Sequence, residues 1–334
     1  GGGAHGGPLG STGGRSPDGT PRFDQAVPSG GYLWWYVDGL SDCGEHGITL
    51  IAFVGSVFSP YYHWAQAGGL RRGRPVAADN HCALNVAIYS PGQKRWAMTE
   101  RGANSVSRSR TVFQIKQSQL SWDGRQLVIN IQERGMPIPF PIRGQVRLSA
   151  DRFFSHQSPL DEAGHHRWGP LAPSAHIEVD LDAPKLRWQG SGYLDSNEGD
   201  EPLTNAFHRW DWLRAPLSDG SAAVLYDVEP IRGTDRLLAL RFGTDGSVAP
   251  FEVSDRLLLK SSGWGVSRAT RIDADGRRPR LVKTLEDTPF YARSEIRTSL
   301  LGERVTAMHE SLYAPRLRSR IVRLMLPWRM PRIS

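Results

Sequence analysis

A tyrosine and an aspartate stand two positions apart at the end of the run Gly190–Asp195 (GSGYLD). Side chains two positions apart leave the same face of an extended strand, so Tyr193 and Asp195 would point the same way. In an aromatic, apolar interior, desolvation would raise the pKa of Asp195 and keep the carboxyl group neutral. A neutral carboxylic acid in an apolar pocket is a proton donor. The alternative is that Asp195-Ser196-Asn197 forms a turn that exposes the carboxylate.

A second polar and aromatic pair, His166 and Trp168, lies upstream with the same spacing. The spacing alone also fits a loop histidine and a core indole. Two further acids compete with Asp195 as proton donor. Asp38 ends the run WWYVD. Asp211 stands between two tryptophans, and in an extended strand its side chain would face the opposite side from both indoles.

Several common catalytic signatures are missing from the sequence. There is no G-x-G-x-x-G or P-loop for a nucleotide, no G-x-S-x-G elbow and no H-E-x-x-H metal motif. Among the ten histidines, His165 and His166 are adjacent and would face opposite sides of a strand. We therefore predict a site that uses neither a metal ion nor a cofactor.

Composition narrows the class of protein further. The chain has 334 residues, 39% hydrophobic and 22% charged, which suits one large domain or two ordinary ones. The net charge of +7 would suit nucleic acid or anionic lipid. Because no nucleic-acid-binding motif is present, lipid is favoured. Two cysteines without a C-x-x-C spacing favour a reducing compartment, the cytoplasm.

The segments that carry the candidate site residues are predicted to be strands. Short apolar runs alternate with turn signals and show few helical periods, which indicates an all-β protein. In the first half they are Leu33–Asp38, Gly47–Val54, Asn85–Ser90, Arg95–Thr99, Thr111–Ile115, Gln126–Glu133 and Ile142–Leu148. In the second half they are Ala175–Leu181, Leu186–Tyr193, Ala206–Leu213, Ala222–Val228, Arg236–Phe242, Leu281–Leu285, Tyr291–Ser299 and Arg304–Tyr313.

About fifteen strands are too many for one small barrel, so we predict two barrel-like or sandwich-like halves. The polar, turn-rich segment 151–173 separates them, which gives domains at 32–160 and 161–313. Residues 1–31 contain eleven glycines and four prolines with few large apolar side chains, and we predict a disordered leader there.

Residues 314–334 form a different kind of segment. Apolar residues recur on one helical face, while arginines lie off it and no acid follows Glu310. The apolar positions are Leu317, Ile321, Leu324, Met325 and Trp328, and the arginines are Arg316, Arg318, Arg320 and Arg323. We predict a short basic amphipathic helix that binds an anionic membrane surface. The alternative is a helix packed on the barrel with its arginines in solvent.

Two long stretches resemble a known family. Trp34–Ala65 (WWYVDGLSDCGEHGITLIAFVGSVFSPYYHWA) is similar to the N-terminal signature of the carotenoid 1,2-hydratases, also called hydroxyneurosporene synthases. His166–Ala215, which contains HRWGPLAPSAHIEVDL and WQGSGYLDSNEGDEPL, is similar to the second half of the same family. The resemblance implies two lipocalin-like β-domains with a long cleft for apolar ligands. It also implies hydration of the C1–C2 double bond of acyclic carotenoids such as neurosporene and lycopene in photosynthetic bacteria.

In that family the essential residues are a His and a Trp two apart, then a Tyr and an Asp in a G-Y-x-D motif. Here they fall on His166, Trp168, Tyr193 and Asp195. Protonation of C2 by Asp195 would leave a tertiary cation at C1, which an indole such as Trp168 can stabilise by about 1–2 kcal/mol. Tyr193 would orient the acid or the water. His166 would tune Asp195 or accept the proton of the attacking water.

The sequence therefore predicts a cytoplasmic, peripherally membrane-bound, cofactor-independent hydratase of acyclic carotenoids. One alternative is a polyene cyclase or pericyclase of the same wider fold family. Another is a non-catalytic lipocalin-like carrier of lipids or pigments.

Overall fold

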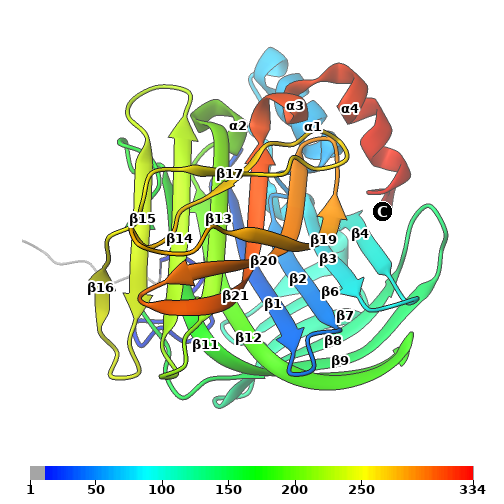
Figure 1. Ribbon diagram of the computed structural model, residues 1–334. Coiled ribbons are helices and arrows are strands. Elements are labelled where there is room, and N and C mark those ends of the chain that lie inside the picture. Colours follow the sequence, from blue (N-terminus) through cyan, green and yellow to red (C-terminus); the bar gives the residue numbers. More distant parts are fainter. Residues whose placement is uncertain (1–11, 334) are drawn as a thin grey trace, which may run out of the picture.

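The computed structural model describes residues 12–333 and consists mainly of antiparallel strands in two large curved sheets (Figure 1). The first sheet has thirteen strands in the order β22-β4-β3-β2-β1-β12-β11-β9-β8-β7-β6-β5, with β10 paired to β11. Its strands are β1 (Tyr32–Ser41), β2 (Gly47–Val54), β3 (Cys82–Tyr89), β4 (Arg95–Arg101), β5 (Val106–Arg108), β6 (Val112–Ile115), β7 (Ser118–Trp122), β8 (Gln126–Arg134), β9 (Pro141–Ser149), β10 (Ser158–Pro159), β11 (His166–Ala183), β12 (Lys185–Gly199) and β22 (Arg332–Ile333).

The second sheet has seven strands in the order β16-β15-β14-β13-β21-β20-β19. They are β13 (Phe207–Pro216), β14 (Ala222–Pro230), β15 (Arg236–Phe242), β16 (Val248–Pro250), β19 (Arg280–Asp287), β20 (Tyr291–Leu300) and β21 (Glu303–Tyr313), and a separate pair is formed by β17 (Leu257–Leu259) and β18 (Arg268–Thr270). The helices are α1 (Pro60–Arg72), α2 (Leu203–Ala206), α3 (Ala314–Arg318) and α4 (Arg320–Met325), with single turns at Ala78–Asn80, Ala103–Ser105 and Leu326–Trp328. The prediction of an all-β fold with a short C-terminal helix is confirmed.

Strand β1 separates two apolar cores, because its side chains alternate between the two faces of the sheet. Tyr32, Trp34 and Tyr36 face the core between the two sheets. Leu33 and Trp35 face a second core, which the curved first sheet encloses. Strand β2 (GITLIAFV) is buried at every position for the same reason, and its β-branched and aromatic content suits a strand with two covered faces.

The chain does not pass from the first sheet to the second at the domain boundary that the sequence predicts. Strands β11 and β12 would belong to the half 161–313, yet they lie in the middle of the first sheet, between β1 and β9. Residues 190–199 of β12 pair with β1, and residues 176–183 of β11 pair with β9. These pairings extend the first sheet to Gly199, and the second sheet begins at Phe207. The predicted halves 32–160 and 161–313 therefore do not match the two sheets.

Residues 12–31 pack on the first sheet, so the prediction of a disordered leader is wrong for this part, and residues 1–11 lie outside the described residues. Phe23 is fully buried, with its ring 4.9 Å from that of Trp35. The indole Nε1–H of Trp35 donates to the carbonyl of Gly14 at 2.8 Å, and Gly14 has a φ of +65° that favours glycine. A few well-placed contacts thus order a segment whose composition is poor in apolar residues.

Arg15 fixes this segment to the sheet. Its guanidinium is buried, with Nη1 donating to the carbonyl of His156 at 2.8 Å. Nη2 donates to the carbonyl of Gly169 at 2.6 Å and to Oγ of Ser196 at 2.7 Å. Burial lowers the pKa of Arg15 to about 10. Backbone carbonyls, rather than a carboxylate, therefore satisfy this buried cation.

The C-terminal segment is helical, as predicted, but it is not one continuous amphipathic helix. It breaks at Ser319 into α3 and α4, and its last residues add strand β22 beside β4. Because of this break, the predicted apolar residues do not form one continuous buried face. Leu317 is buried, whereas Ile321, Leu324 and Trp328 are 72%, 68% and 74% exposed.

We expect Arg15→Ala to lower the free energy of unfolding by more than about 2 kcal/mol, since several buried carbonyls lose their donor. Urea denaturation of both proteins measures this difference. The control is Arg22→Ala, which removes an exposed pair with Asp24 and is expected to change stability by less than about 0.5 kcal/mol. Equal, small effects of the two substitutions would show that residues 12–31 do not belong to the cooperative fold.

Candidate active site

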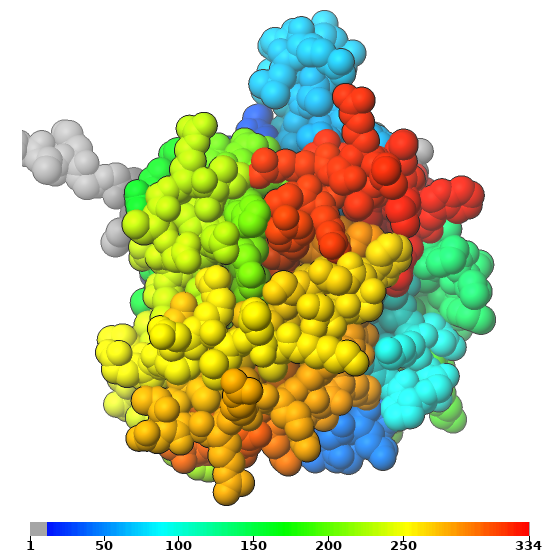
Figure 2. Space-filling model, turned by 45° about the horizontal axis from the view of Figure 1, so that its top comes forward, coloured from blue at the N-terminus to red at the C-terminus, as the bar shows by residue number. Residues whose placement is uncertain are grey.

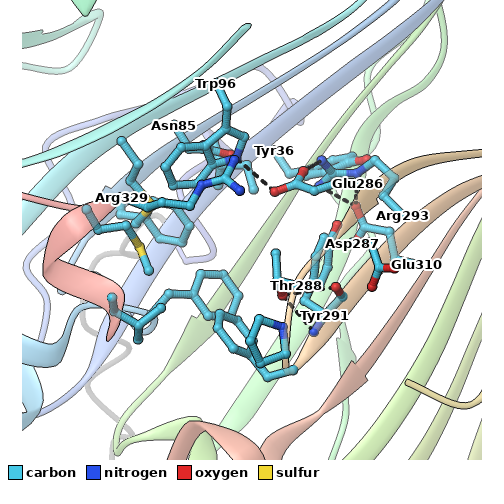
Figure 3. Close-up of a pocket in the computed structure, with 18 of the residues that line it drawn as sticks. Tyr36, Asn85, Trp96, Glu286, Asp287, Thr288, Tyr291, Arg293, Glu310 and Arg329 are labelled. Carbon is cyan, nitrogen blue, oxygen red and sulfur yellow. Dashed lines mark hydrogen bonds and ion pairs between the residues drawn. The ribbon is translucent and has the colours of Figure 1, made fainter. Parts of the chain in front are cut away.

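A cavity of about 370 Å³ lies between the two sheets (Figure 3). Asp195 and Tyr226, both buried, line its inner end. Trp264 and Trp328, both exposed, line its outer end, beside the C-terminal segment. The cavity therefore runs from the molecular surface to a buried carboxyl group, which suits a long apolar ligand that enters end first.

The strand register places the predicted acid on the wall of this cavity. Asp195 of β12 lies opposite Tyr36 of β1, and Tyr193 follows the same alternation. Across the other edge of β12, Trp168 of β11 lies opposite Asn197. Because residues two apart share a face, these side chains all point into the core between the sheets. The segment after Tyr193 is thus a strand and not a turn.

Asp195 is held by two hydrogen bonds to one oxygen. The indole Nε1–H of Trp168 and the hydroxyl of Tyr193 donate to Oδ2 at 2.7 and 2.8 Å. The other oxygen, Oδ1, is buried and has no partner among the described residues. Desolvation raises the pKa of Asp195 to about 8, although the two hydrogen bonds oppose this shift. At neutral pH the group is mostly a neutral acid, with Oδ1 free to carry its proton.

The structure places His166 elsewhere, away from the cavity wall. Its ring is fully buried, lies within 2.8 Å of the Tyr32 hydroxyl and stands edge-on to Phe207. Its Nε2 lies 3.6 Å from a carboxylate oxygen of Glu201. Gly199, opposite on β12, leaves room for this pair, because a Cβ there would collide with Tyr32 and His166. Burial lowers the pKa of His166, so the ring is mainly neutral at pH 7.

Neither rival acid lines the cavity. Asp38 accepts from the guanidinium Nε of Arg214 at 2.8 Å and from the hydroxyl of Tyr36 at 2.9 Å. Asp211 accepts from Arg209 at 2.7 Å and, through its other oxygen, from a backbone N–H. Both carboxyl groups are committed to structural partners, which leaves Asp195 as the candidate acid.

A charged cluster that the sequence patterns did not single out lies on the opposite wall. Glu286, Arg293 and Glu310 stand side by side on β19, β20 and β21. Arg293 is 1% exposed and donates to both carboxylates at 2.8–2.9 Å. The three residues lie on three successive strands and follow no short motif, so it is strand pairing that brings them together.

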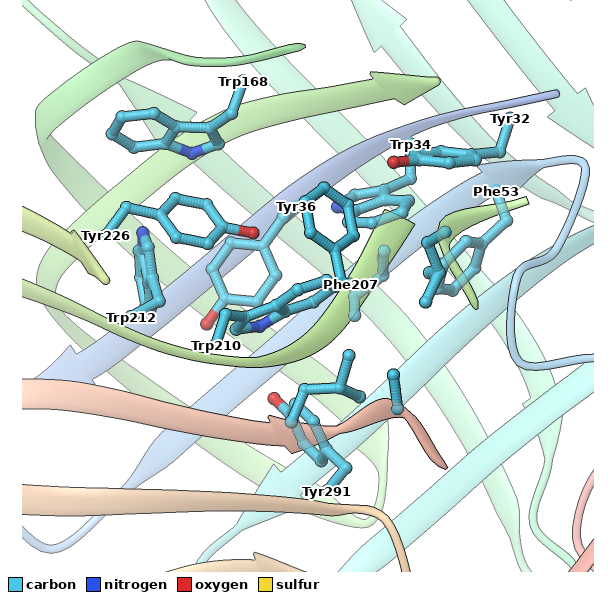
Figure 4. Close-up of a cluster of buried hydrophobic side chains, with 14 of the residues drawn as sticks. Tyr32, Trp34, Tyr36, Phe53, Trp168, Phe207, Trp210, Trp212, Tyr226 and Tyr291 are labelled. Atoms are coloured by element: carbon cyan, nitrogen blue, oxygen red, sulfur yellow. The ribbon is translucent and has the colours of Figure 1, made fainter. Parts of the chain in front are cut away.

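Aromatic rings line much of the remaining wall, and Figure 4 shows the buried cluster to which several of them belong. Indoles of Trp34, Trp210 and Trp212 line the cavity together with the phenol of Tyr226. The ring of Trp212 lies 5.2 Å from that of Tyr193, so an electron-rich face stands next to the acid. The ring of Trp168 packs behind Tyr226, at 5.2 Å, and is not itself on the wall.

A family model for carotenoid hydratase CrtC matches residues 50–334. The chain belongs to this family. It is therefore an enzyme of the carotenoid hydratase family, as the sequence resemblance predicts. It is 53% identical over 315 residues to an acyclic carotenoid 1,2-hydratase of Rubrivivax gelatinosus, covering 94% of this chain and 76% of that protein. It is 49% identical to the corresponding hydratase of Thiocapsa roseopersicina, covering 99% of this chain and 80% of the relative.

Solved structures show the same fold at low sequence identity. A crystal structure of an AttH-type protein of Nitrosomonas europaea matches with a TM-score of 0.60 at 14% identity, over 85% of this chain and 92% of that one. A structure of CghA with Sch210972 matches with a TM-score of 0.50 at 12% identity, over 91% of this chain and 97% of that one. The likeness to the AttH-type protein shows a lipocalin-like arrangement of two large curled sheets.

One group of possible metal ligands occurs among residues 12–333. Cys43, Glu45 and His46 lie close together in the turn between β1 and β2. Cys43 and Glu45 are exposed, and none of the three lines the cavity. A metal ion there would not contact a ligand in the cavity.

We expect Asp195→Asn to remove a pH dependence of stability. Because the pKa of Asp195 is raised on folding, the folded state binds more protons than the unfolded state between about pH 4 and pH 8. Wild-type stability therefore falls across this window, by up to about 1.4 kcal/mol per pH unit from this group. Asparagine has no such titration, so the variant gains stability relative to wild type as the pH rises to 8. Denaturation curves that differ by the same amount at pH 5 and pH 8 would contradict the raised pKa.

Proposed function

We propose that the protein adds water across the terminal C1–C2 double bond of an acyclic carotenoid such as neurosporene or lycopene, without a cofactor. The observation that carries this proposal is the unpartnered Oδ1 of Asp195 at the inner end of an aromatic cavity. The names of the relatives from Rubrivivax and Thiocapsa support the same reaction.

The reaction begins when the proton on Oδ1 of Asp195 passes to C2. The π electrons form the new C–H bond and leave a tertiary cation at C1. The faces of Trp34, Trp210 and Trp212 stabilise this cation, each by roughly 1–2 kcal/mol where the ring is desolvated. Water then forms the C1–O bond and loses a proton, and the return of one proton to Asp195 restores the acid. The product carries one added water.

Trp168 and Tyr193 hold and orient the acid. Their two hydrogen bonds fix Oδ2, which leaves the proton to the unpartnered Oδ1. They also stabilise the carboxylate that remains after proton transfer, because both donors are in place before the reaction. In this proposal Trp168 acts through Asp195 rather than by contact with the cation.

His166 is proposed as a positioning residue. Its contact with Tyr32 fixes a phenol that stacks on Trp34 at 4.9 Å, and Trp34 lines the cavity. His166 does not itself line the cavity, which argues against a role as the base for the attacking water.

Two other functions remain distinguishable by experiment. A polyene cyclase changes the retention time and absorption spectrum of its substrate without changing its mass. A carrier returns its ligand unchanged. Incubation with lycopene or neurosporene, followed by chromatography and mass analysis, separates these outcomes from hydration, which adds the mass of one water.

We expect Asp195→Asn to fold, to bind the carotenoid and to lose about 10²–10⁴-fold or more of its hydration rate, because asparagine cannot deliver a proton. Asp195→Glu retains an acid that is displaced by one methylene and should be partly active. The wild-type rate should fall as the pH rises through about 8, where Asp195 ionises. If Asp195→Asn kept more than about a tenth of the wild-type rate while Asp38→Asn or Asp211→Asn abolished it, the proton would come from elsewhere.

We also propose that the enzyme works at the cytoplasmic surface of an anionic membrane, from which the carotenoid enters the cavity. The described part of the chain contains no helix that is long and apolar enough to cross a bilayer. The C-terminal segment instead exposes the apolar side chains of Ile321, Leu324 and Trp328, and Trp328 also lines the cavity. Both cysteines are free, which fits a reducing compartment.

Helix α1 extends the same surface. Figure 2 shows α1 (blue) and the C-terminal segment (red) projecting at one edge of the molecule. The tip of α1 carries Leu70, which is 85% exposed, followed by Arg71 and Arg72. No acidic residue occurs between Glu45 and Asp79 or after Glu310, whereas the C-terminal segment has six arginines (Arg316, Arg318, Arg320, Arg323, Arg329 and Arg332). Exposed apolar side chains can insert into the surface of an anionic bilayer, and the neighbouring arginines can bind its headgroups.

We expect the combined substitution of Ile321, Leu324 and Trp328 by serine to weaken co-sedimentation with vesicles of mixed neutral and anionic lipid by more than about tenfold. Leu258→Ser is the matched control, because Leu258 is 75% exposed on β17 and does not line the cavity. Added salt should weaken wild-type binding as well. Undiminished vesicle binding by the triple variant would show that these side chains serve another purpose.

A further inference from the structure

Water capture in the proposed hydration requires a proton acceptor in the cavity. When water bonds to C1, its oxygen carries a positive charge until a proton leaves. His166 does not line the cavity, and Oδ2 of Asp195 already accepts two hydrogen bonds. Besides Asp195, the carboxylates on the described cavity wall are Glu286, Asp287 and Glu310.

Two of these carboxylates are poor candidates for the proton acceptor, because one already accepts several hydrogen bonds and the other lies at the outer end of the cavity. Glu286 accepts from Trp96 through Oε1 at 2.8 Å, and from Tyr89 and Arg293 through Oε2 at 3.0 and 2.9 Å. Asp287 accepts backbone N–H groups of the loop that carries the exposed Trp264, at the outer end of the cavity. Neither has a free oxygen beside the reacting carbons.

Glu310 differs from both. Arg293 donates to its Oε1 through Nε and Nη2, at 2.9 and 2.8 Å. None of the described residues donates a hydrogen bond to its Oε2. Its negative charge is a minor contribution to the raised pKa of Asp195, which desolvation dominates.

A buried N–H without an acceptor lies next to Glu310. Trp212 is opposite Glu310 in the pairing of β13 with β21, and both side chains line the cavity. The Nε1–H of Trp212 is buried and has no acceptor among residues 12–333. The indole ring lies 5.2 Å from that of Tyr193, which holds the acid. An unpaired donor and an unpaired carboxylate oxygen on adjacent strands are the kinds of partner that a bound water molecule needs.

We propose that Glu310 is the general base that removes the proton from the attacking water, and that Trp212 donates a hydrogen bond to the oxygen of this water. This assignment rests on the proposed hydration and names the acceptor that it requires. A lone pair of the water forms the C1–O bond while one O–H bond breaks and its proton passes to Oε2 of Glu310. The proton then returns through water to Asp195, which gave its own proton to C2. Both carboxyl groups end as they began.

Arg293 positions this base. Its two donors leave Oε2 as the acceptor, and its partners Glu286 and Glu310 give the cluster a net negative charge of one. A net negative wall opposite the acid favours the cation at C1 over the neutral alkene, and it avoids the repulsion that an unpaired arginine would cause.

Deuterium exchange separates the two halves of the reaction. In D₂O, Asp195 delivers deuterium to C2, and a cation that is not captured returns to alkene by losing a proton. Recovered substrate then contains deuterium. We expect Glu310→Gln to lower the hydration rate by about 10²-fold and to leave exchange within about threefold of wild type, so that the ratio of exchange to hydration rises by more than about tenfold. Trp212→Phe, which keeps a ring but removes the N–H, should raise the ratio in the same direction.

Glu303→Gln is the matched control, because Glu303 lies on the same strand as Glu310 but does not line the cavity, and the substitution should leave the ratio unchanged. A folded Glu310→Gln or Trp212→Phe protein with a wild-type ratio would overturn the assignment. Loss of exchange together with hydration in Glu310→Gln would also overturn it, since Glu310 would then act before water capture. Asp195→Asn tests the proposed hydration separately: it should abolish both exchange and hydration, and retention of both would reject the acid whatever Glu310 does.

Discussion

Burial of one carboxyl group constrains the rest of the site. Asp195 lies in the core between two sheets, and the loss of its hydration raises its pKa to about 8. A carboxyl group in such a place needs donors that orient it without ionising it. Trp168 and Tyr193 satisfy one oxygen, and the other is left for a proton. The aromatic rings around it suit the same requirement, because apolar ring faces keep the acid desolvated and can stabilise a cation.

The two-residue period of a β-strand explains how one sheet can supply this environment. Tyr36 and Asp195 face the core between the sheets, while their neighbours Trp35 and Ser196 face the opposite side. There, Ser196 accepts a hydrogen bond from the buried Arg15. The N-terminal segment therefore supports the strand from behind at the position next to the acid. This contact links the order of residues 12–31 to the geometry of the active site.

Local patterns predicted the strands and the pair of Tyr193 and Asp195, because alternation and turn residues act over a few positions. Helix α1 was not predicted, because it contains two glycines and lacks an apolar stripe. It is stabilised instead by a serine cap and by tertiary contacts. The place of β11 and β12 in the first sheet depends on long-range pairing. Glu310 approaches Arg293 through the register of the hairpin formed by β20 and β21, and no motif marks the two residues as partners. Spacing along the chain carries no information about such partners.

An enzyme that hydrates an alkene must exclude water from its acid and still hold one water for the cation. The two sheets divide these tasks. The first sheet carries Asp195 among rings, and the second carries Glu310 with the unpartnered indole N–H of Trp212. In the proposed reaction the acid therefore belongs to one sheet and the base to the other, so that the proton and the water are supplied by different walls of the cavity.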